Sequence, residues 1–205
     1  MTGLPVNRRQ FIAGSATIAG GLILGIGFTD NPAEAMPNSR TDSLQPNAWL
    51  QITPENAVIF QLDKTEMGQG VYTALPTILA EELGIDPRSI RIELAPVHSD
   101  FQDNTMQMTG GSASVASRWD ILRQTGARAR HMLIAAAARA WSVTPADCYA
   151  ENGRVYRKDT GDSVAFGDVA SAAAREKIPD NPILKEPSDY IYIGKSLRRL
   201  DGAAK

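Results

Sequence analysis

The sequence predicts an α/β (α+β) fold, in which a βαβ-type unit with a long second helix is followed by a small hairpin-helix unit. Two β-rich stretches, 49–52 and 57–62, flank the tetrapeptide Thr-Pro-Glu-Asn at 53–56, an arrangement typical of a hairpin. Apolar residues then recur at helical spacing over 71–83. Residues 90–94 alternate apolar and charged side chains, as a half-exposed strand does. Strand, helix and strand with short links form a βαβ-like unit.

The two main helices have different end signals. The first is expected to end at Gly84, because a glycine just past a helix adopts the left-handed conformation at little cost. The second is expected to run from about Ser112 to Trp141, where one face stays apolar. Its arginines are expected on the solvated face. Arg118 has an alternative role, because its place near the glycine turns described below brings a phosphate within its reach.

The smaller unit is expected to begin at Thr144-Pro145, where a capping residue precedes a proline at the first helical position. Residues 148–157 are expected to form a hairpin around an Asn152-Gly153 turn. Residues 166–175 are expected to form a short alanine-rich helix. The long polar stretch 96–109, between the expected strand at 90–94 and the second long helix, is expected to be an irregular connection. Connections of that length are often functional.

The first 35 residues are interpreted as a signal peptide and not as part of the fold. Asn7-Arg8-Arg9-Gln10-Phe11-Ile12 is a twin-arginine signature, a weakly hydrophobic run follows at 13–28, and Ala33-Glu34-Ala35 has the small-x-small pattern of a cleavage site. A retained membrane anchor is the alternative, but glycines interrupt the run and a span needs about 20 apolar residues. Export to the periplasm, with membrane association as the alternative, is therefore expected. The twin-arginine route carries folded proteins, which favours a redox cofactor.

Three further segments complete the expected organisation. Residues 36–47 are rich in proline, asparagine and serine and are expected to be a linker. Residues 48–178 are expected to belong to one domain. Residues 179–205 hold three prolines and no regular pattern, so an extended tail is expected there.

Composition excludes several kinds of site. The net charge is -2 over 205 residues, so nothing favours nucleic acid as a partner. The single cysteine, Cys148, rules out an internal disulfide and a four-cysteine metal or iron–sulfur site within the chain. Cys148 is expected to be a small buried apolar residue.

Two glycine-bearing stretches are the candidate ligand-binding segments. The first is Lys-Thr-Glu-Met-Gly-Gln-Gly at 64–70, at the entry to the first helix. Gly68 and Gly70 permit positive φ and close approach of a ligand to the backbone, and the amide of Gln69 can donate and accept hydrogen bonds. Free N–H groups and the dipole at a helix start favour an anion. The alternative is a plain strand-to-helix turn.

The second stretch is Met-Gln-Met-Thr-Gly-Gly-Ser-Ala-Ser at 106–114, where two glycines precede two serines at the expected start of the long helix. Ser112 or Ser114 can hold phosphate oxygens, or can instead cap that helix. Neither stretch continues into Gly-Lys-Ser/Thr or fits the dinucleotide fingerprint, so a nucleotide P-loop and a Rossmann site are excluded.

Together the stretches resemble a known family. Residues 65–70 resemble the molybdopterin-binding turn of the xanthine dehydrogenase and aldehyde oxidase family, and residues 109–114 resemble its serine-bearing segment over the cofactor. The form Gln-Met-Thr-Gly-Gly-Ser at 107–112 is similar to the branch typified by the isoquinoline 1-oxidoreductase large (beta) subunit. The resemblance covers essentially the whole chain. Further matching stretches lie at 133–138, 151–153, 193–195 and 200–205.

The resemblance implies a function. Such subunits hold a molybdenum–molybdopterin cofactor, usually the cytosine dinucleotide form, and hydroxylate N-heterocycles or oxidise aldehydes with oxygen from water. Electrons leave through a small subunit with two [2Fe–2S] clusters and then a cytochrome c. The cofactor's dithiolene holds the metal, so no metal ligand is expected from the chain. The residues that the resemblance assigns to the cofactor's phosphate and pterin are Gly68, Gln69, Gly70, Gly110, Gly111, Ser112 and Ser114.

The resemblance is to the N-terminal part of a large subunit only. Family subunits are several times longer, so residues 48–178 correspond to the N-terminal segment of a molybdopterin-binding domain, and 179–205 lead toward a domain that is missing here. The family's catalytic base, a late glutamate, falls in the missing part. We therefore assign no catalytic residue, and we expect Glu66, Glu81 and Glu82 to be structural or solvated and the chain alone to be inactive.

Two other interpretations stay open. The chain can be a non-catalytic remnant that binds the cofactor or a partner large subunit after export. It can also be an exported α/β protein that reuses the fold. In each case, faces that family members bury against later domains are expected to form exposed apolar patches.

Overall fold

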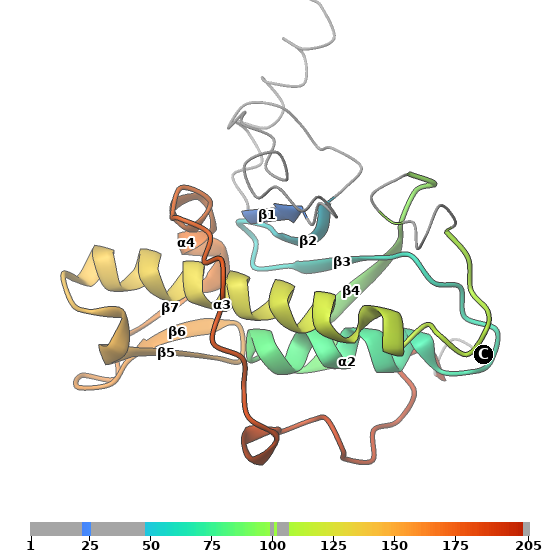
Figure 1. Cartoon of the computed structure of the whole chain (residues 1–205). Helices are drawn as coiled ribbons and strands as arrows, with labels where there is room; N and C mark the ends of the chain where they lie inside the picture. The colour runs from blue at the N-terminus through green and yellow to red at the C-terminus, as the bar shows by residue number, and fades with distance from the viewer. Residues whose placement is uncertain (1–21, 26–47, 99–100, 102–106, 203–205) are drawn as a thin grey trace, which may run out of the picture.

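A computed structural model of the chain describes residues 22–25, 48–98, 101 and 107–202 (Figure 1). The predicted linker at 36–47 and most of the predicted signal peptide lie outside these residues. The strands described are β1 (Leu22–Gly25), β2 (Ala48–Ile52), β3 (Val58–Leu62), β4 (Ile90–Leu94), β5 (Cys148–Glu151), β6 (Arg154–Arg157) and β7 (Ser163–Ala165), and the α-helices are α2 (Val71–Leu83), α3 (Trp119–Trp141) and α4 (Phe166–Ala173).

The first sheet confirms the predicted hairpin and βαβ unit. Its strand order is β1-β2-β3-β4. β2 and β3 are antiparallel, with Leu50 opposite Phe60, and β3 and β4 are parallel, with Leu62 opposite Leu94. Because β3 and β4 run in the same direction, the segments that follow both strands leave the sheet at the same edge. The first glycine turn and the 96–109 connection therefore start side by side.

Part of the predicted signal peptide forms an edge strand. β1 pairs antiparallel with β2, with Ile23 opposite Gln51. We expected residues 1–35 to lie outside the fold, and at 22–25 that expectation is wrong. The physical reason is that β2 is otherwise an open edge, and the apolar sequence Leu-Ile-Leu-Gly can pair with it. Whether residues 1–35 direct export stays a prediction.

The helix boundaries agree at α2 and differ at α3. α2 ends at Leu83 and is capped, as predicted, by Gly84, which has φ 79° and donates its N–H to Ala80 O. α3 begins at Trp119 and not at Ser112. Gly111 and Ser112 have φ 62° and 56°, in the left-handed region that a right-handed helix cannot include. Ser112 and Ser114 therefore do not cap α3.

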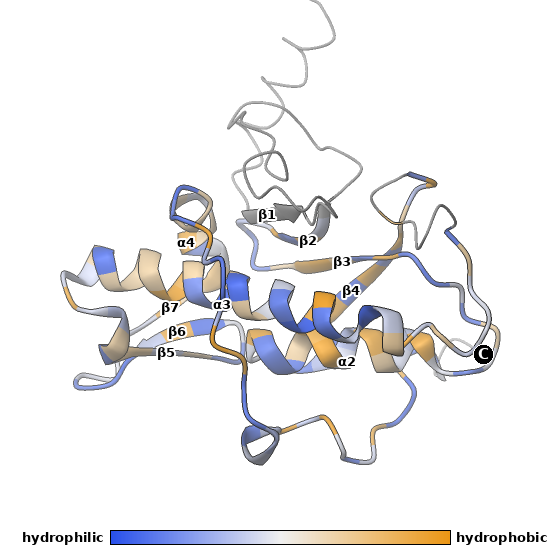
Figure 2. Cartoon of the chain, in the orientation of Figure 1, coloured by the Kyte–Doolittle hydropathy of each residue, from blue (hydrophilic) through white to orange (hydrophobic). Residues whose placement is uncertain are grey.

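The core lies between the first sheet and α2 and α3. β3 buries alternate residues, as a half-covered strand does. In Figure 2 the hydrophobic colours concentrate on β3 and on α2 where it faces its neighbours. The fully buried side chains of this region include Trp49, Phe60, Leu75, Leu79 and Leu133. No helix in the described part of the chain is both long and apolar enough to span a membrane.

α2 and α3 lie side by side (Figure 1) and are in tight contact at Gly126. A Cβ atom added to Gly126 would lie 2.6 Å from Leu79 O and 2.9 Å from the Cβ of Glu82. The helix pair therefore leaves no room there for any side chain larger than hydrogen.

The smaller unit also follows the prediction, with one added strand. β5 and β6 form a hairpin whose Asn152 and Gly153 have φ 49° and 76°, the signs of a type I′ turn. β7, which the sequence did not reveal, pairs with β6. Asn56 joins this unit to the first sheet, because its side-chain amide donates to Gly153 O at 3.3 Å and its Oδ1 accepts from Gly167 N at 2.8 Å. Cys148 is buried and free, as expected.

Residues 179–202 form what we call the C-terminal strap, an irregular segment that packs along the helices instead of leaving the fold. The Glu81 carboxylate binds the backbone in the middle of this strap. One carboxylate oxygen of Glu81 accepts from the N–H groups of Ile191, Tyr192 and Ile193 at 3.0, 2.7 and 3.1 Å, and the other accepts from Lys185 Nζ at 2.8 Å. The Glu81 side chain is fully buried. The expectation that Glu81 is structural is thus confirmed, while the expected tail leading away is wrong for the described residues.

Arginines of α3 hold the start of the strap, so the expectation of a solvated face is wrong for them. Arg123 and Arg130 pair with the buried carboxylate of Glu82. They also donate to the backbone carbonyls of Lys185 and Ile183, at 2.6 and 2.7 Å. These guanidinium groups satisfy carbonyls of an irregular segment that has no sheet or helix partner.

Substituting Gly126 by alanine is expected to lower the free energy of unfolding by about 1–3 kcal/mol, because α2 and α3 must separate to admit the methyl group. Chemical denaturation measures the change. Gln124→Ala, on the exposed face of the same helix, is the control and should stay within about 0.5 kcal/mol of the unaltered chain. A stabilisation by Gly126→Ala, the ordinary helical result, would contradict the packing described.

The Glu81 carboxyl makes stability pH-dependent. Burial alone would raise its pKa, but Lys185 and the three strap N–H groups outweigh burial and lower the pKa. The contribution of this carboxyl to the free energy of unfolding is therefore complete above the ordinary glutamate pKa. It is lost as the pH falls through the lower pKa that Glu81 has in the folded protein. Glu81→Gln should cost about 3 kcal/mol at neutral pH and flatten this acid-side loss in pH-dependent unfolding curves. Glu186→Gln, an exposed strap carboxylate, should change neither.

Candidate functional site

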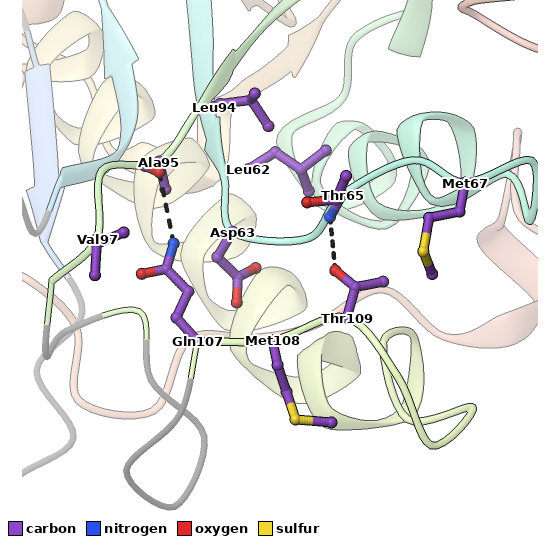
Figure 3. Close-up of a pocket in the computed structure, with 10 residues that line it drawn as sticks. All are labelled: Leu62, Asp63, Thr65, Met67, Leu94, Ala95, Val97, Gln107, Met108 and Thr109. Atoms are coloured by element: carbon purple, nitrogen blue, oxygen red, sulfur yellow. Dashed lines mark hydrogen bonds between the residues drawn. The ribbon is translucent and has the colours of Figure 1, made fainter.

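The two glycine-bearing stretches lie against each other, as their predicted convergence on one ligand requires. The backbone N–H of Thr65 donates to Oγ1 of Thr109 at 2.7 Å (Figure 3). Beside this bond, Lys64 Nζ donates to Met108 O at 3.1 Å. Two direct bonds thus join segments that lie more than forty residues apart in the chain.

A buried ion cluster lies beneath this junction. Arg118 donates to Asp63 Oδ2 through Nη2 at 2.5 Å and through Nε at 3.0 Å, and Lys64 Nζ lies 3.3 Å from the same oxygen. The side chains of Asp63 and Arg118 are fully buried. The Arg118 guanidinium also lies 5.2 Å from the centre of the Trp49 ring. The alternative role of Arg118 as a phosphate ligand is therefore wrong, because its guanidinium is buried and its charge is already paired with the carboxylate of Asp63.

A groove of about 450 Å³ opens above this cluster (Figure 3). Its floor is formed where β3 and β4 end, and the crevice outside the carboxyl ends of parallel strands is a common ligand position. Asp63 is one of the lining residues, and its buried Oδ1 has no hydrogen-bond partner within the described residues. The lining residues are Leu62, Asp63, Thr65, Met67, Leu94, Ala95, Val97, Gln107, Met108 and Thr109.

The groove rim is an exposed apolar patch. Met67, Leu94, Val97 and Met108 have 67%, 62%, 90% and 48% of their surfaces exposed. Large apolar side chains rarely form a contiguous solvent-exposed patch unless that patch binds another molecule or segment. The predicted apolar patches are therefore present at this place, directly beside the first glycine turn.

The first glycine turn has the predicted backbone but not the predicted free N–H groups. Gly68 and Gly70 have φ 103° and 89°, and the space over both α-carbons is open. The Glu66 carboxylate, however, accepts from the N–H groups of Gly68 and Gly70 at 2.7 and 3.0 Å and from that of Tyr72 at 3.0 Å. The premise of an open anion site at this helix start is therefore wrong, since a carboxylate of the chain itself fills it.

The Gln69 side chain is used within the same turn. Its Oε1 accepts from Met67 N at 2.6 Å, and its Nε2 donates to Thr65 O at 2.9 Å. Gln69 therefore closes the turn in the described state, and a ligand that used this amide would have to compete with these bonds.

The electrostatics of the turn follow from its bonds. Burial of the Glu66 carboxyl would raise its pKa, but hydrogen bonds from the N–H groups of Gly70, Tyr72 and Gly68 and the charge of Arg199 lower the pKa below its ordinary value. Glu66 is therefore ionised at neutral pH. The expectation that Glu66 is structural is confirmed.

The second glycine turn is the more open of the two. Ala113 N donates to Gly110 O at 3.3 Å, and Gly111 and Ser112 between them both have positive φ, which makes a type I′ turn. Within the described residues, the N–H groups and hydroxyls of Ser112 and Ser114 and the N–H groups of Gly110 and Gly111 have no hydrogen-bond partner. Unpaired backbone N–H and hydroxyl groups on an exposed turn can bind phosphate oxygens.

The structure thus brings together all seven predicted site residues in two adjoining turns, and it adds others that the sequence did not single out. Thr109 joins the turns, Asp63 anchors them, and Arg199 reaches Glu66 from the far end of the chain. Thr109 lies in the quoted motif, but no local signal pairs residues 66 and 199. No group of three or more His, Cys, Asp or Glu side chains suited to a metal occurs among the described residues.

Comparison with known proteins gives a consistent result. The family model of the molybdopterin cofactor-binding domain matches residues 8–195. The protein named isoquinoline 1-oxidoreductase subunit beta, from Brevundimonas diminuta, is 30% identical over 181 residues, covering 85% of this chain and 23% of its own length. The protein named membrane-bound aldehyde dehydrogenase [pyrroloquinoline-quinone], from Gluconacetobacter polyoxogenes, is 29% identical over 211 residues, covering 98% of this chain and 26% of its own length.

Solved structures are more distant. Quinoline 2-oxidoreductase from Pseudomonas putida 86 has 20% sequence identity and a TM-score of 0.45, over 60% of this chain and 15% of that one. Reconstituted CO dehydrogenase from Oligotropha carboxidovorans has 24% identity and a TM-score of 0.44, over 74% and 18% of the two chains. The present chain spans about a quarter of the length of the curated relatives it matches, at 23% and 26%.

Thr109→Val should separate the two turns, because valine keeps the shape but leaves Thr65 N without its acceptor. The expected loss of unfolding free energy is about 1 kcal/mol, with faster amide exchange at Thr65. Thr109→Ser keeps the hydroxyl and is the matched control. Equal behaviour of the valine and serine variants would show that this bond does not join the turns.

Proposed function

This chain belongs to the molybdopterin cofactor-binding domain family, and from that premise we propose that it supplies part of the cofactor cradle in the large subunit of a molybdenum hydroxylase. The observation that carries the proposal is the family match over residues 8–195. The geometry supports it, because two glycine turns adjoin beside a groove at the carboxyl ends of parallel strands.

The two turns fit the cofactor in different ways. The second turn, 110–114, offers unpaired N–H and hydroxyl groups to an anionic group. The first turn offers open space above Gly68 and Gly70, where any Cβ would stand between the backbone and a ligand. Gly110, Gly111, Ser112 and Ser114 are thus proposed to hold the phosphate end, while Gly68, Gln69 and Gly70 approach the rest. The bound cofactor supplies the molybdenum centre that oxidises substrate with oxygen from water.

The finer assignments are proposals that the relatives' names support. One relative is named for isoquinoline and another for aldehyde, so N-heterocycles and aldehydes are the proposed substrate classes. We further propose the cytosine dinucleotide form of the cofactor and a periplasmic location. The proposed partners are the remaining large-subunit segments, a small subunit with two [2Fe–2S] clusters, and a cytochrome c.

The exposed rim of the groove supports association with further protein. Met67, Leu94 and Val97 are apolar and more than half exposed. A working subunit would bury such a patch against other segments that complete the cofactor site. No residue of this chain is proposed as the catalytic base.

Native co-purification from the exporting host tests the function. Molybdenum analysis and mass spectrometry of the eluate should find molybdenum, a pterin nucleotide and a second chain that carries the remaining segments. A chain that is purified alone and without molybdenum would instead be a non-catalytic remnant. Recovery of a quinone cofactor in place of the pterin would overturn the proposal, and one relative's name makes that a specific alternative.

Gly111→Ala and Gly161→Ala form a matched pair. Both glycines have positive φ, at 62° and 75°, and neither has an atom within 4 Å of an added Cβ. Each substitution should therefore cost a similar backbone strain, about 1–2 kcal/mol. Only Gly111→Ala is expected to reduce the molybdenum bound per chain in the purified complex, by about tenfold, because only its methyl enters the cradle. Equal metal contents in the two variants would remove Gly111 from the site.

A further inference from the structure

The first glycine turn carries its own anion. Three backbone N–H groups, of Gly68, Gly70 and Tyr72, converge on the Glu66 carboxylate at 2.7–3.0 Å. Convergent N–H groups at a helix start form a site for one negative charge, and here a side chain of the turn itself supplies that charge. The Glu66 side chain is only 7% exposed, so solvent does not compete freely for it.

Arg199 completes this arrangement from the C-terminal strap. Its Nη2 donates to Glu66 Oε1 at 3.0 Å, and its Nη1 donates to Gly68 O at 2.9 Å. Next to it, Leu200 N donates to Thr73 Oγ1 at 3.0 Å, which ties the strap to the first turn of α2. Arg199 is also paired with Asp201 at 2.9 Å, so the guanidinium approaches the turn in a fixed orientation.

These contacts have a consequence for the ligand. A phosphate approaching Gly68 and Gly70 would meet an ionised carboxylate that already holds the available N–H groups. Displacing Glu66 would cost those hydrogen bonds and the ion pair with Arg199. An uncharged ring meets no such penalty, because the surface over both glycines is open.

We propose that Glu66 and Arg199 are positioning residues that hold the first glycine turn in its ligand-ready shape, and that this turn meets the uncharged part of the cofactor and not its phosphates. The statement about the cofactor rests on the proposed function. The statement about the turn does not, since it concerns the unliganded chain.

Chemical rescue tests the positioning role in the full chain. Glu66→Ala removes the internal anion, so amide exchange at Gly68, Gly70 and Tyr72 should accelerate by about tenfold. Added formate, a free carboxylate of the right size, should restore protection at these three amides. Acceleration without rescue would mean that Glu66 acts through packing alone, and unchanged exchange would mean that it does not hold the turn. Glu66→Gln removes the charge but keeps an acceptor oxygen, and it is the second variant if the alanine variant unfolds. It should accelerate exchange at the same amides by less than the alanine change, and exchange equal to that of the unaltered chain would show that the charge of Glu66 does not hold the turn.

Arg199 has a close control. Arg199→Ala should raise exchange at Gly68 and Gly70 and move the acid loss of their protection to higher pH, while Arg199→Lys should retain part of the protection. Arg88→Ala is the control, since Arg88 is likewise exposed and paired with an aspartate two residues away, Asp86, far from the turn. The proposal fails for Arg199 if both alanine variants behave alike.

Titration with inorganic phosphate separates this inference from the proposed function. In the unaltered chain, phosphate should leave the amide signals of Gly68, Gly70 and Tyr72 unmoved, and in Glu66→Ala it should shift them. Phosphate-induced shifts at these amides in the unaltered chain would overturn the inference. The molybdenum content of the purified complex reports on the proposed function, and either result can fail without the other.

Discussion

The buried pair of Asp63 and Arg118 is the interaction on which the site's arrangement depends. Asp63 follows β3 directly and Arg118 precedes α3 directly, so one ion pair fixes the ends of both segments that carry glycine turns. Both side chains are fully buried, and a lone charge at either position would lack the compensation that makes its burial tolerable. Lys64, beside the same carboxylate, extends the cluster to Met108 O on the second stretch.

Carboxylates organise irregular backbone in two further places. Glu66 accepts from two N–H groups of the first glycine turn and from that of Tyr72 at the start of α2, and Glu81 accepts from three consecutive N–H groups of the C-terminal strap. In both cases the segment has no helix or sheet partner for these groups, and an ionised oxygen satisfies several of them at once. A basic side chain, Arg199 or Lys185, balances each carboxylate. The strap thereby links the helix pair to the candidate site.

This architecture explains how the proposed cofactor cradle can form on an ordinary α/β frame. Parallel strands β3 and β4 deliver two loops to one edge, and the ion cluster sets their spacing. The groove between them is apolar and open at its rim, with Met67 and Val97 prominent. Such a contiguous apolar surface suits contact with another molecule or segment.

The sequence by itself determined the βαβ unit, the Asn152-Gly153 hairpin and the two glycine turns, because periodicity, turn chemistry and motif are local properties. It also carried the family resemblance, which the comparison confirmed. Only the tertiary structure decided which partners the charged side chains bind. That Arg118 is buried against Asp63, that Glu66 fills its own turn and that Arg199 returns to it depend on contacts between residues far apart in the chain. The strap folds back for the same reason, since a local pattern does not record a distant carboxylate. The late start of α3 has a different cause, because the helical periodicity did not reveal that Ser112, a residue other than glycine, adopts positive φ.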